Sequence, residues 1–369
     1  MQKNTAKIYT SFLAASILLT ASLAYAQNKT EKTKMVGHRN QIVATDFVPA
    51  DGITDASDAI QKLIDDNPNR TIYFPDGTYL LKKPILTPAS PKRSVSLVLD
   101  NYAVIKASDD WTGDEALVRL GASHPANDIN TIGSVYGLEG GIIDGSGKAK
   151  GISIDGGRET FIRNVSIKHV QVGIHIKRGA NSGSSDSDVR DVNIIGNNKA
   201  DSIGVLLDGY DNTLTNMRIA SVNIGILVKS GGNSLRNLHP LYIFNSQNNY
   251  ETSCGFVDLC GSNWYSFCYS DQFSVGFKLK PEIVSIFNNC FCYWYSGKVP
   301  FQTAIKCDGK FNSIFTDFRA GFSGEVTVVR SLILAEPGGQ GFLQNVVLGR
   351  RTMGPEDKTK EYLQGRLIQ

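Results

Sequence analysis

The chain has 369 residues and a formal net charge of +3, from 38 Lys and Arg residues against 35 Asp and Glu residues. Because charges of both signs are mixed along the chain, the composition gives no reason to expect a nucleic acid as partner. Beyond residues 1–26, no segment is long and apolar enough to span a bilayer, so we expect no membrane span.

The N-terminus has the three parts of a secretory signal peptide. Lys3 and Lys7 precede an uncharged apolar run over residues 8–23, and an Ala-Tyr-Ala sequence ends at Ala26. A basic start, an apolar stretch too short for a stable span and small residues at the end are typical of a cleaved signal peptide. We therefore expect cleavage near Ala26, a polar leader over residues 27–40, and a secreted or periplasmic protein.

The next segment predicts a short helix followed by two strands. Asp55 or Ser57 can cap an amphipathic helix over residues 59–64, and residues 71–80 form two apolar runs around a Pro-Asp-Gly turn. The apolar face of such a helix can cover the open end of a stack of strands, where backbone groups would otherwise stay unpaired.

From residue 151 onward, a short strand that begins with Gly or Ala recurs every 21 to 31 residues. Its starting residues are Gly151, Gly173, Gly204, Gly225, Gly255, Gly276 and Ala304. Short strands with a period of two cannot bury their apolar face alone, so successive repeats must stack as coils of a solenoid. The repeat predicts an all-β fold, a right-handed parallel β-helix over residues 41–349, followed by a C-terminal tail over residues 350–369.

All six cysteines lie between Cys254 and Cys307. Cys268, Cys290 and Cys292 alternate with aromatic residues as inward strand positions do, which favours a buried stack of thiols over disulfides. A metal site is weaker still, because no paired Cys and His spacing occurs.

Residues 47–81 resemble the opening of β-helix proteins of the pectate lyase superfamily, which includes polygalacturonases, pectate lyases, fructotransferases and phage tailspikes. The resemblance rests on Asp-Gly-Ile-Thr-Asp-Ala-Ser-Asp-Ala-Ile-Gln from Asp51 and on Ile-Tyr-Phe-Pro-Asp-Gly-Thr-Tyr from Ile72. It implies the β-helix fold and a polysaccharide or oligosaccharide as ligand, and it does not select a reaction. The catalytic motifs of polygalacturonases and the calcium cluster of pectate lyases are missing at the matching coils. No cofactor is evident, and calcium stays possible without a motif to support it.

Alignment of the repeats predicts two outward walls. On the first wall, Asp and Lys alternate from coil to coil, which favours a ladder of ion pairs. Beside that ladder, Leu206, Leu227 and Val257 form an apolar stripe that predicts a homotrimer interface, as in trimeric members of the superfamily.

The second wall carries basic, polar and aromatic residues, which we interpret as a sugar groove because aromatic rings stack on sugar faces. The predicted catalytic residues are Arg218, His239, Tyr242, Tyr269 and Asp271. The predicted substrate-binding residues are Lys168, Asn193, Tyr250, Trp264, Tyr265 and Trp294.

Several functions remain open at this point. Cleavage of a uronate-containing polysaccharide by β-elimination would use Arg218 as the cation, His239 as the base, and Tyr242 or Tyr269 as the acid. A glycoside hydrolase would pair Asp208 or Asp211 with Asp258 or Asp271. An intramolecular fructotransferase and a β-helix that binds glycans or has a structural role without catalysis are the further alternatives.

Overall fold

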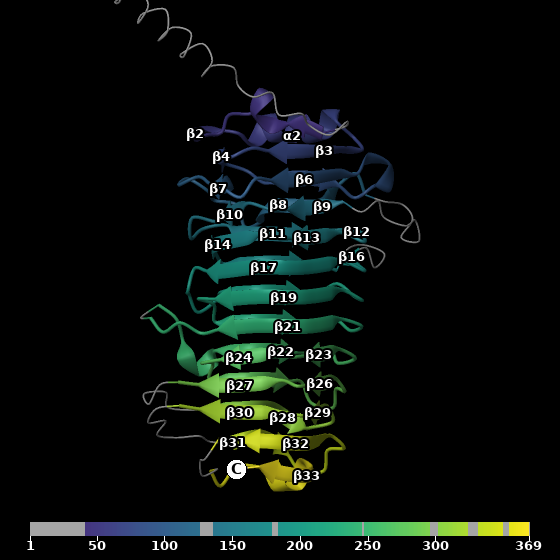
Figure 1. Ribbon diagram of the computed structural model, residues 1–369, viewed down its shortest axis with the longest axis vertical. Coiled ribbons are helices and arrows are strands. Elements are labelled where there is room, and N and C mark those ends of the chain that lie inside the picture. Colours follow the sequence, from purple (N-terminus) through teal and green to yellow (C-terminus); the bar gives the residue numbers. More distant parts are fainter. Residues whose placement is uncertain are drawn as a thin grey trace, which may run out of the picture. The chain divides into compact units, whose positions relative to one another are not determined.

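The computed structural model describes residues 41–125, 136–178, 184–245, 247–295, 302–323, 331–349 and 354–368. The signal peptide and the polar leader predicted for residues 1–40 lie outside the described residues. From Gln41 onward the chain forms one unit, in which successive coils stack along one axis (Figure 1).

One wall of the stack, here called the back wall, is a parallel sheet of ten strands. Its strands in chain order are β5 (Ile85–Pro88), β8 (Ala116–Ser123), β11 (Lys150–Ile154), β15 (Val172–Ile176), β18 (Ile203–Leu207), β20 (Ile224–Val228), β22 (Cys254–Asp258), β25 (Val275–Leu279), β28 (Thr303–Lys310) and β31 (Ser331–Glu336). Each strand after β5 pairs with the one before it, so the predicted repeat and the predicted parallel β-helix are confirmed.

The glycines near the start of these strands lie one above another, at positions where the next coil leaves no room for a side chain. A Cβ atom added to Gly173 would lie 2.5 Å from the Gly204 carbonyl oxygen of the next coil and 2.7 Å from the inward Ile194 side chain. Ordinary van der Waals contact needs about 3.5 Å. Glycine at this position therefore lets adjacent coils approach to the spacing of a sheet.

The second sheet has 21 strands in the described residues and bends into two faces. The first face contains β1 (Gln41–Val43), β3 (Arg70–Phe74), β6 (Val95–Leu99), β9 (Gly137–Glu139), β13 (Phe161–Arg163), β23 (Trp264–Ser266), β26 (Ile286–Asn288) and β29 (Ile314–Thr316). The second face contains β2 (Asp51–Asp55), β4 (Gly77–Leu81), β7 (Ala103–Ala107), β10 (Ile142–Asp144), β14 (Ser166–Val170), β24 (Tyr269–Asp271), β27 (Phe291–Trp294) and β30 (Arg319–Phe322). Five longer strands run through the bend: β17 (Asp188–Gly196), β19 (Thr213–Ala220), β21 (Ser234–Leu241), β32 (Phe342–Leu348) and β33 (Leu363–Ile368).

The two ends of the stack are closed by short elements. Helix α2 (Ser57–Asp66) buries Ile60, Leu63 and Ile64, which confirms the predicted helix. Its N-cap residue is Ala56, which has no side-chain cap, while Asp55 accepts a hydrogen bond from the Ser57 amide at 2.9 Å. At the other end, α3 (Thr359–Tyr362) leads into β33, which pairs with β32, so the segment expected as a tail supplies a strand of the last coil.

The remaining short elements lie at the turns. They are the strand pair β12 (Gly157–Arg158) and β16 (Ser184–Ser185), and the 3-10 turns η1 (Ala44–Asp46), η2 (Pro91–Arg93) and η4 (Tyr250–Thr252). No helix in the described part of the chain has the length and apolar character that a bilayer crossing requires.

Asparagine side chains form a ladder at the corner between the back wall and the first face. Asn212, Asn233 and Asn263 are buried and follow one another from coil to coil. The Oδ1 atom of Asn233 accepts the Asn212 amide at 3.0 Å, and the Oδ1 atom of Asn263 accepts the Asn233 amide at 3.0 Å. The ladder thus satisfies buried backbone groups that the turns leave unpaired.

Buried thiols lie in the core of the later coils. Cys268, Cys290 and Cys292 are buried, as their alternation predicts, and all six cysteines are free. Burial raises the pKa of the Cys290 and Cys292 thiols well above their ordinary value, so these groups stay protonated at neutral pH.

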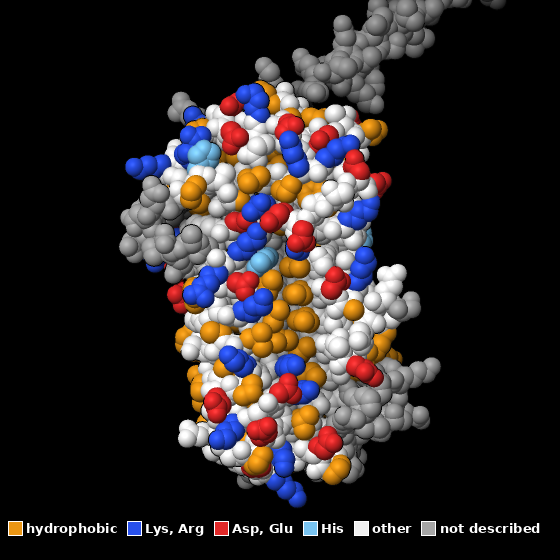
Figure 2. Space-filling model, turned by 180° about the vertical axis from the view of Figure 1, so that it is seen from behind, with side chains coloured by type: hydrophobic (Ala, Val, Ile, Leu, Met, Phe, Trp, Pro, Cys, Tyr) orange, Lys and Arg blue, Asp and Glu red, His pale blue; other side chains and the backbone are white. Residues whose placement is uncertain are grey.

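Figure 2 shows the back wall, where ion pairs flank an apolar patch. Lys177 contacts Asp155 and Lys229 contacts Asp208, which confirms these two pairs of the predicted ladder, whereas Asp308 pairs with Lys278 and Lys306 of the adjacent column. Next to it, Leu206, Leu227 and Val257 align in register on consecutive strands. Leu206 and Leu227 are half-buried and Val257 is 7% exposed. The homotrimer through this stripe stays a prediction.

At the bend between the two faces, one residue of each coil adopts the left-handed backbone conformation. One of these residues, Phe267, is of a type that rarely adopts it. Asn216, Asn237 and Asn289 have φ values of 54°, 52° and 51°, which asparagine adopts readily. Phe267 occupies the equivalent place with φ 55° and is 53% exposed. An exposed phenylalanine gains little from burial there and carries the steric cost of the left-handed conformation.

Replacing Phe267 by asparagine is therefore expected to stabilise the fold by about 1 kcal/mol, because the left-handed conformation costs other residues about 1–2 kcal/mol. Equilibrium denaturation in guanidinium chloride measures this change. The reverse substitution Asn289→Phe, one coil further on, should destabilise by a similar amount. A Phe267→Asn variant less stable than the parent would show that the ring makes a contact that outweighs the backbone strain.

Candidate functional site

Four of the five residues predicted as catalytic lie together on the second face. Arg218 on β19 is in register with Asn193 on β17 and with His239 on β21. Their side chains point outward, because the neighbouring residues Ile194, Ile219 and Pro240 are buried. Tyr269 follows on β24, and its ring stacks on His239 with centroids 4.1 Å apart and planes 15° apart.

The column continues beyond the tyrosine as a stack of rings. Tyr269 stacks on Phe291 of β27 at 4.8 Å, and the guanidinium of Arg319 lies over the Phe291 ring at 5.1 Å. Stacked rings on successive strands stabilise a sheet and also fix the orientation of each ring. The His239 imidazole is therefore held nearly parallel to the Tyr269 ring, and the stack restricts its rotation.

Asp271 anchors the same group from the adjacent outward column. Its Oδ2 atom lies 3.3 Å from the Nε2 atom of His239, and the side chains are 15% and 25% exposed. Burial raises the pKa of the Tyr269 phenol, and the charge of Asp271 together with a hydrogen bond to it raises it further. Tyr269 is thus protonated at neutral pH. The other carboxylate oxygen, Oδ1, is buried and has no hydrogen-bond partner in the described structure.

Arg218 supplies the positive charge of this cluster. Its side chain is exposed, and within the described residues it forms no ion pair. A cation without a partner carries no internal counterion that an anionic ligand would have to displace. We call Arg218, His239, Tyr269 and Asp271 the His239 cluster.

Three of the predicted site residues are in the core, so their expected exposure was wrong. Tyr242, Tyr265 and Trp294 are each 1% exposed. Tyr242 packs edge-on against Phe273, Tyr265 donates a hydrogen bond to Asp258, and the Trp294 indole donates one to the Phe273 carbonyl oxygen. The cause is strict strand alternation: each follows an outward residue directly, and side chains of consecutive strand residues point to opposite faces.

The other predicted binding residues divide between two surfaces. Lys168 and Asn193 both lie on the second face: Ser166, two residues before Lys168, is in register with Asn193, and Asn193 is in register with Arg218 of the His239 cluster. Tyr250 is half-buried in the turn after β21, where it packs against Tyr242 at 5.4 Å between ring centroids. Trp264 is 50% exposed on the first face, on the other side of the bend.

In each carboxylate pair predicted for a hydrolase, the two carboxylates lie in different parts of the fold. Asp258 is 1% exposed and hydrogen-bonded within the core. Asp208 lies on the back wall, where it pairs with His175 at 2.7 Å and Lys229 at 3.7 Å. Asp211 is at the corner after the back wall, and Asp271 is on the second face. Two carboxylates must flank one sugar bond for hydrolysis, so this arrangement does not fit it.

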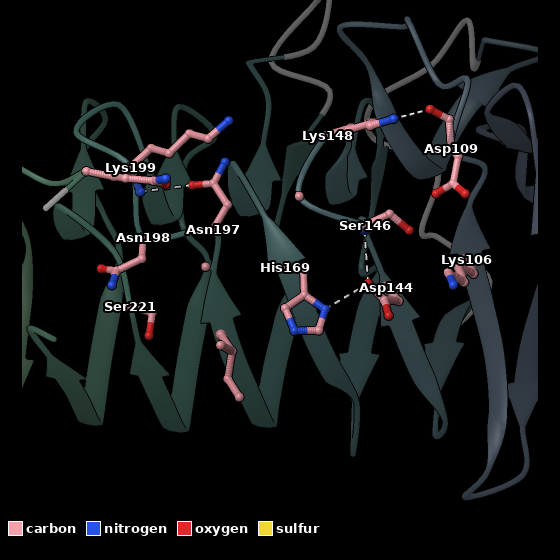
Figure 3. A pocket seen from close by; sticks show the side chains of 14 residues that line it. Lys106, Asp109, Asp144, Ser146, Lys148, His169, Asn197, Asn198, Lys199 and Ser221 are labelled. Carbon is pink, nitrogen blue, oxygen red and sulfur yellow. Dashed lines mark hydrogen bonds and ion pairs between the residues drawn. The ribbon is translucent and has the colours of Figure 1, made fainter. Parts of the chain in front are cut away.

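Sequence reasoning missed a pocket on the same face, with a volume of about 850 Å³. Figure 3 shows it between the turn after β10 and the turn after β17, and its lining residues are Lys106, Asp109, Asp144, Ser146, Gly147, Lys148, His169, Ile195, Gly196, Asn197, Asn198, Lys199, Ser221 and Gln247. The Nδ1 atom of His169 lies 3.0 Å from Asp144, whose Oδ1 atom also accepts the Ser146 amide at 2.9 Å. Within the described residues, no group of three or more His, Cys, Asp or Glu side chains could hold a metal ion.

Residues 44–256, more than half of the chain, match the model of the family described as rhamnogalacturonase A/epimerase, pectate lyase-like. The chain therefore belongs to this family, and the resemblance to the pectate lyase superfamily is confirmed. No curated protein matches the chain significantly.

Solved structures share the fold at low sequence identity. The A-module of a mannuronan C-5 epimerase from Azotobacter vinelandii is 15% identical with a TM-score of 0.54, over 89% of this chain and 100% of that one. A tailspike capsular polysaccharide depolymerase of the Acinetobacter baumannii bacteriophage Fri1 is 10% identical with a TM-score of 0.55, over 90% of this chain and 63% of that one. The catalytic unit of a thermostable α-1,3-glucanase from Streptomyces thermodiastaticus is 12% identical with a TM-score of 0.51, over 91% and 69%. At these identities the likeness defines the fold alone.

Proposed function

We propose that this protein is an exported enzyme that cleaves a uronate-containing polysaccharide by β-elimination at the His239 cluster. The observation that carries the proposal is the order of side chains on consecutive coils: an unpaired cation, an imidazole held by a carboxylate, and a protonated phenol. Family membership and the names of two similar structures, a mannuronan epimerase and a capsular polysaccharide depolymerase, support a polysaccharide as substrate. The N-terminal Lys3, Lys7 and Ala26 pattern supports export.

The reaction assigns one role to each side chain. The Arg218 guanidinium pairs with the uronate carboxylate, which stabilises the negative charge that develops when C5 loses its proton. His239 takes that proton through Nδ1, since Nε2 faces Asp271. The electron pair forms the C4–C5 double bond, the bond from C4 to the glycosidic oxygen breaks, and Tyr269 donates its proton to the leaving oxygen.

Asp271 positions both proton-transfer groups without contacting the sugar in this scheme. Its carboxylate holds His239 in one tautomer and one orientation, and it accepts a hydrogen bond from Tyr269. A tyrosine phenol is protonated throughout the neutral range, so Tyr269 is present as an acid, and Asp271 orients its hydroxyl group.

The test is incubation with a panel of uronate polymers, with ultraviolet absorbance reporting the unsaturated product and a reducing-end assay reporting any cleavage. We expect absorbance and reducing ends to rise together on at least one polymer. Arg218→Ala should lower kcat/KM by about 10²-fold, because a charge-assisted hydrogen bond contributes about 1.5–3 kcal/mol. The matched control is Arg236→Ala, an exposed arginine on the first-face half of the neighbouring strand β21.

Two results would reject this reaction. Reducing ends without ultraviolet absorbance would indicate hydrolysis, and neither signal on any uronate polymer would favour glycan binding without catalysis. Equal losses from Arg218→Ala and Arg236→Ala would show that the effect is one of net charge and not of the cluster.

A further inference from the structure

Four lysines surround the pocket described above, and three of them line it. Lys106, Asp144 and Lys168 follow one another in register on the outward side of β7, β10 and β14, and Ile195 comes next on β17. Lys148 projects from the turn after β10 and Lys199 from the turn after β17, so the pocket is bordered by ammonium groups from both turns (Figure 3).

Two acidic side chains, Asp109 and Asp144, also line the pocket, so the lysines outnumber the carboxylates but are not free of them. The Oδ1 atom of Asp144 is occupied by the Ser146 amide and by His169. Lys148 donates to the backbone oxygen of Asp109, not to its carboxylate. Within the described residues, Lys106, Lys168 and Lys199 form no ion pair, whereas several lysines of the back wall do. Counting Lys168, four lysines face two carboxylates here, so the pocket region carries an excess of two positive charges.

The pocket lies on the same face as the His239 cluster, and its lining approaches the cluster at Ile195. Ile195, which lines the pocket, is two residues from the outward Asn193, and Asn193 is in register with Arg218. Two strand residues span about 6.6 Å, and adjacent coils are about 4.8 Å apart. From Asp144 the outward column runs through Lys168, Ile195 and Ala220 to Leu241. Leu241 is two residues from His239 on the same strand, and the four steps from Asp144 to Leu241 cover about 19 Å.

We propose that this pocket is a subsite for an anionic sugar residue, a uronate or a sulfated sugar, of a polysaccharide that runs along the second face to Arg218 and His239. The inference rests on the proposed function, because it assumes that the chain held at the His239 cluster extends into the pocket. Its polar rim, with Asn197, Asn198 and Ser221, suits sugar hydroxyl groups, while the lysines suit the charged substituent.

Affinity measurements in a His239→Ala background test the subsite without turnover. The variant Lys106→Gln/Lys148→Gln/Lys199→Gln removes the lining ammonium groups and keeps side-chain length. The matched control is Lys92→Gln/Lys280→Gln/Lys310→Gln, which removes the same charge from exposed lysines outside the second face. Isothermal titration would use polygalacturonate and polymannuronate as carboxylate probes, dextran sulfate as the sulfate probe, and carboxyl-reduced polygalacturonate as the neutral probe.

We expect at least one anionic polymer to bind, with the pocket variant about tenfold weaker, since three exposed charge contacts of about 0.5 kcal/mol each amount to that factor. The control variant should bind like its parent, and which anionic polymer binds identifies carboxylate or sulfate. Binding of the neutral polymer as tight as that of its acidic form, equal losses in the two lysine variants, or no binding of any anionic polymer would overturn the subsite. Failure of the proposed function is distinguishable, because it shows as missing unsaturated product from the unmodified protein.

Discussion

Replacing His239 by alanine is expected to lower the rate of β-elimination by about 10²–10⁴-fold, the contribution typical of a positioned general base. The imidazole is held by two independent contacts, the Asp271 carboxylate at 3.3 Å and the stacked Tyr269 ring at 4.1 Å. Initial rates from the ultraviolet absorbance of the unsaturated product measure the effect, and a melting curve checks the fold.

His175→Ala is a closely matched control for this variant. His175 also pairs with an aspartate, Asp208, at 2.7 Å, and is 23% exposed, but it lies on the back wall. We expect this substitution to leave the rate within about twofold of the parent, as for a surface group away from the site. Equal activity of His239→Ala and the parent would exclude His239 as the base.

Replacing Asp258 by alanine is expected to destabilise the protein by about 4 kcal/mol, because several buried donors would lose their acceptor at once. The carboxylate is 1% exposed. It accepts hydrogen bonds from the amides of Cys260 and Gly261, from the Asn263 side chain and from the hydroxyl groups of Tyr265 and Ser285. Asp258 therefore links the asparagine ladder, through Asn263, to Ser285 of the next coil.

The same substitution at Asp308, an aspartate that is 52% exposed on the back wall, gives the control. Its ion pairs with Lys278 and Lys306 are exposed, so we expect a loss below about 1 kcal/mol. Equilibrium unfolding in guanidinium chloride compares the two variants. A loss from Asp258→Ala no larger than that from Asp308→Ala would contradict the role assigned to the buried carboxylate.

The β-helix could be predicted from the sequence because one glycine and one asparagine mark the same two positions in successive coils. Gly173 and Gly204 stand at places where a Cβ atom would collide with the next coil, and Asn233 and Asn263 mark the corners. Counting from these positions also places Arg218 next to His239 on adjacent strands, as the pairing of β19 with β21 confirms. Register of this kind follows from the repeat alone.

The inward and outward assignment of aromatic residues was less secure. In the run Phe291, Cys292, Tyr293 and Trp294, alternation places every second side chain in the core, yet all the rings look equally suited to a sugar surface. Tyr265 and Tyr269 differ by four residues and still face opposite ways, because Phe267 between them adopts a left-handed conformation that changes the phase. A pattern of residue types does not reveal such a bend.

The pocket could not be predicted for a different reason. Lys106 and Asp144 belong to coils before residue 151, where the glycine repeat has not begun, so their register had no marker in the sequence. Lys148 and Lys199 come from turns of different length, and turn conformation depends on contacts with neighbouring coils. Only the assembled coils bring these charges to one place.

The most direct test of the central claim is a crystal structure of the His239→Ala variant with a bound uronate oligosaccharide. The account predicts a sugar chain along the second face, with a carboxylate at the Arg218 guanidinium and the glycosidic oxygen of the next bond within hydrogen-bonding distance of the Tyr269 hydroxyl group. An oligosaccharide bound on the first face beside Trp264, or on the back wall, with the second face empty, would contradict it.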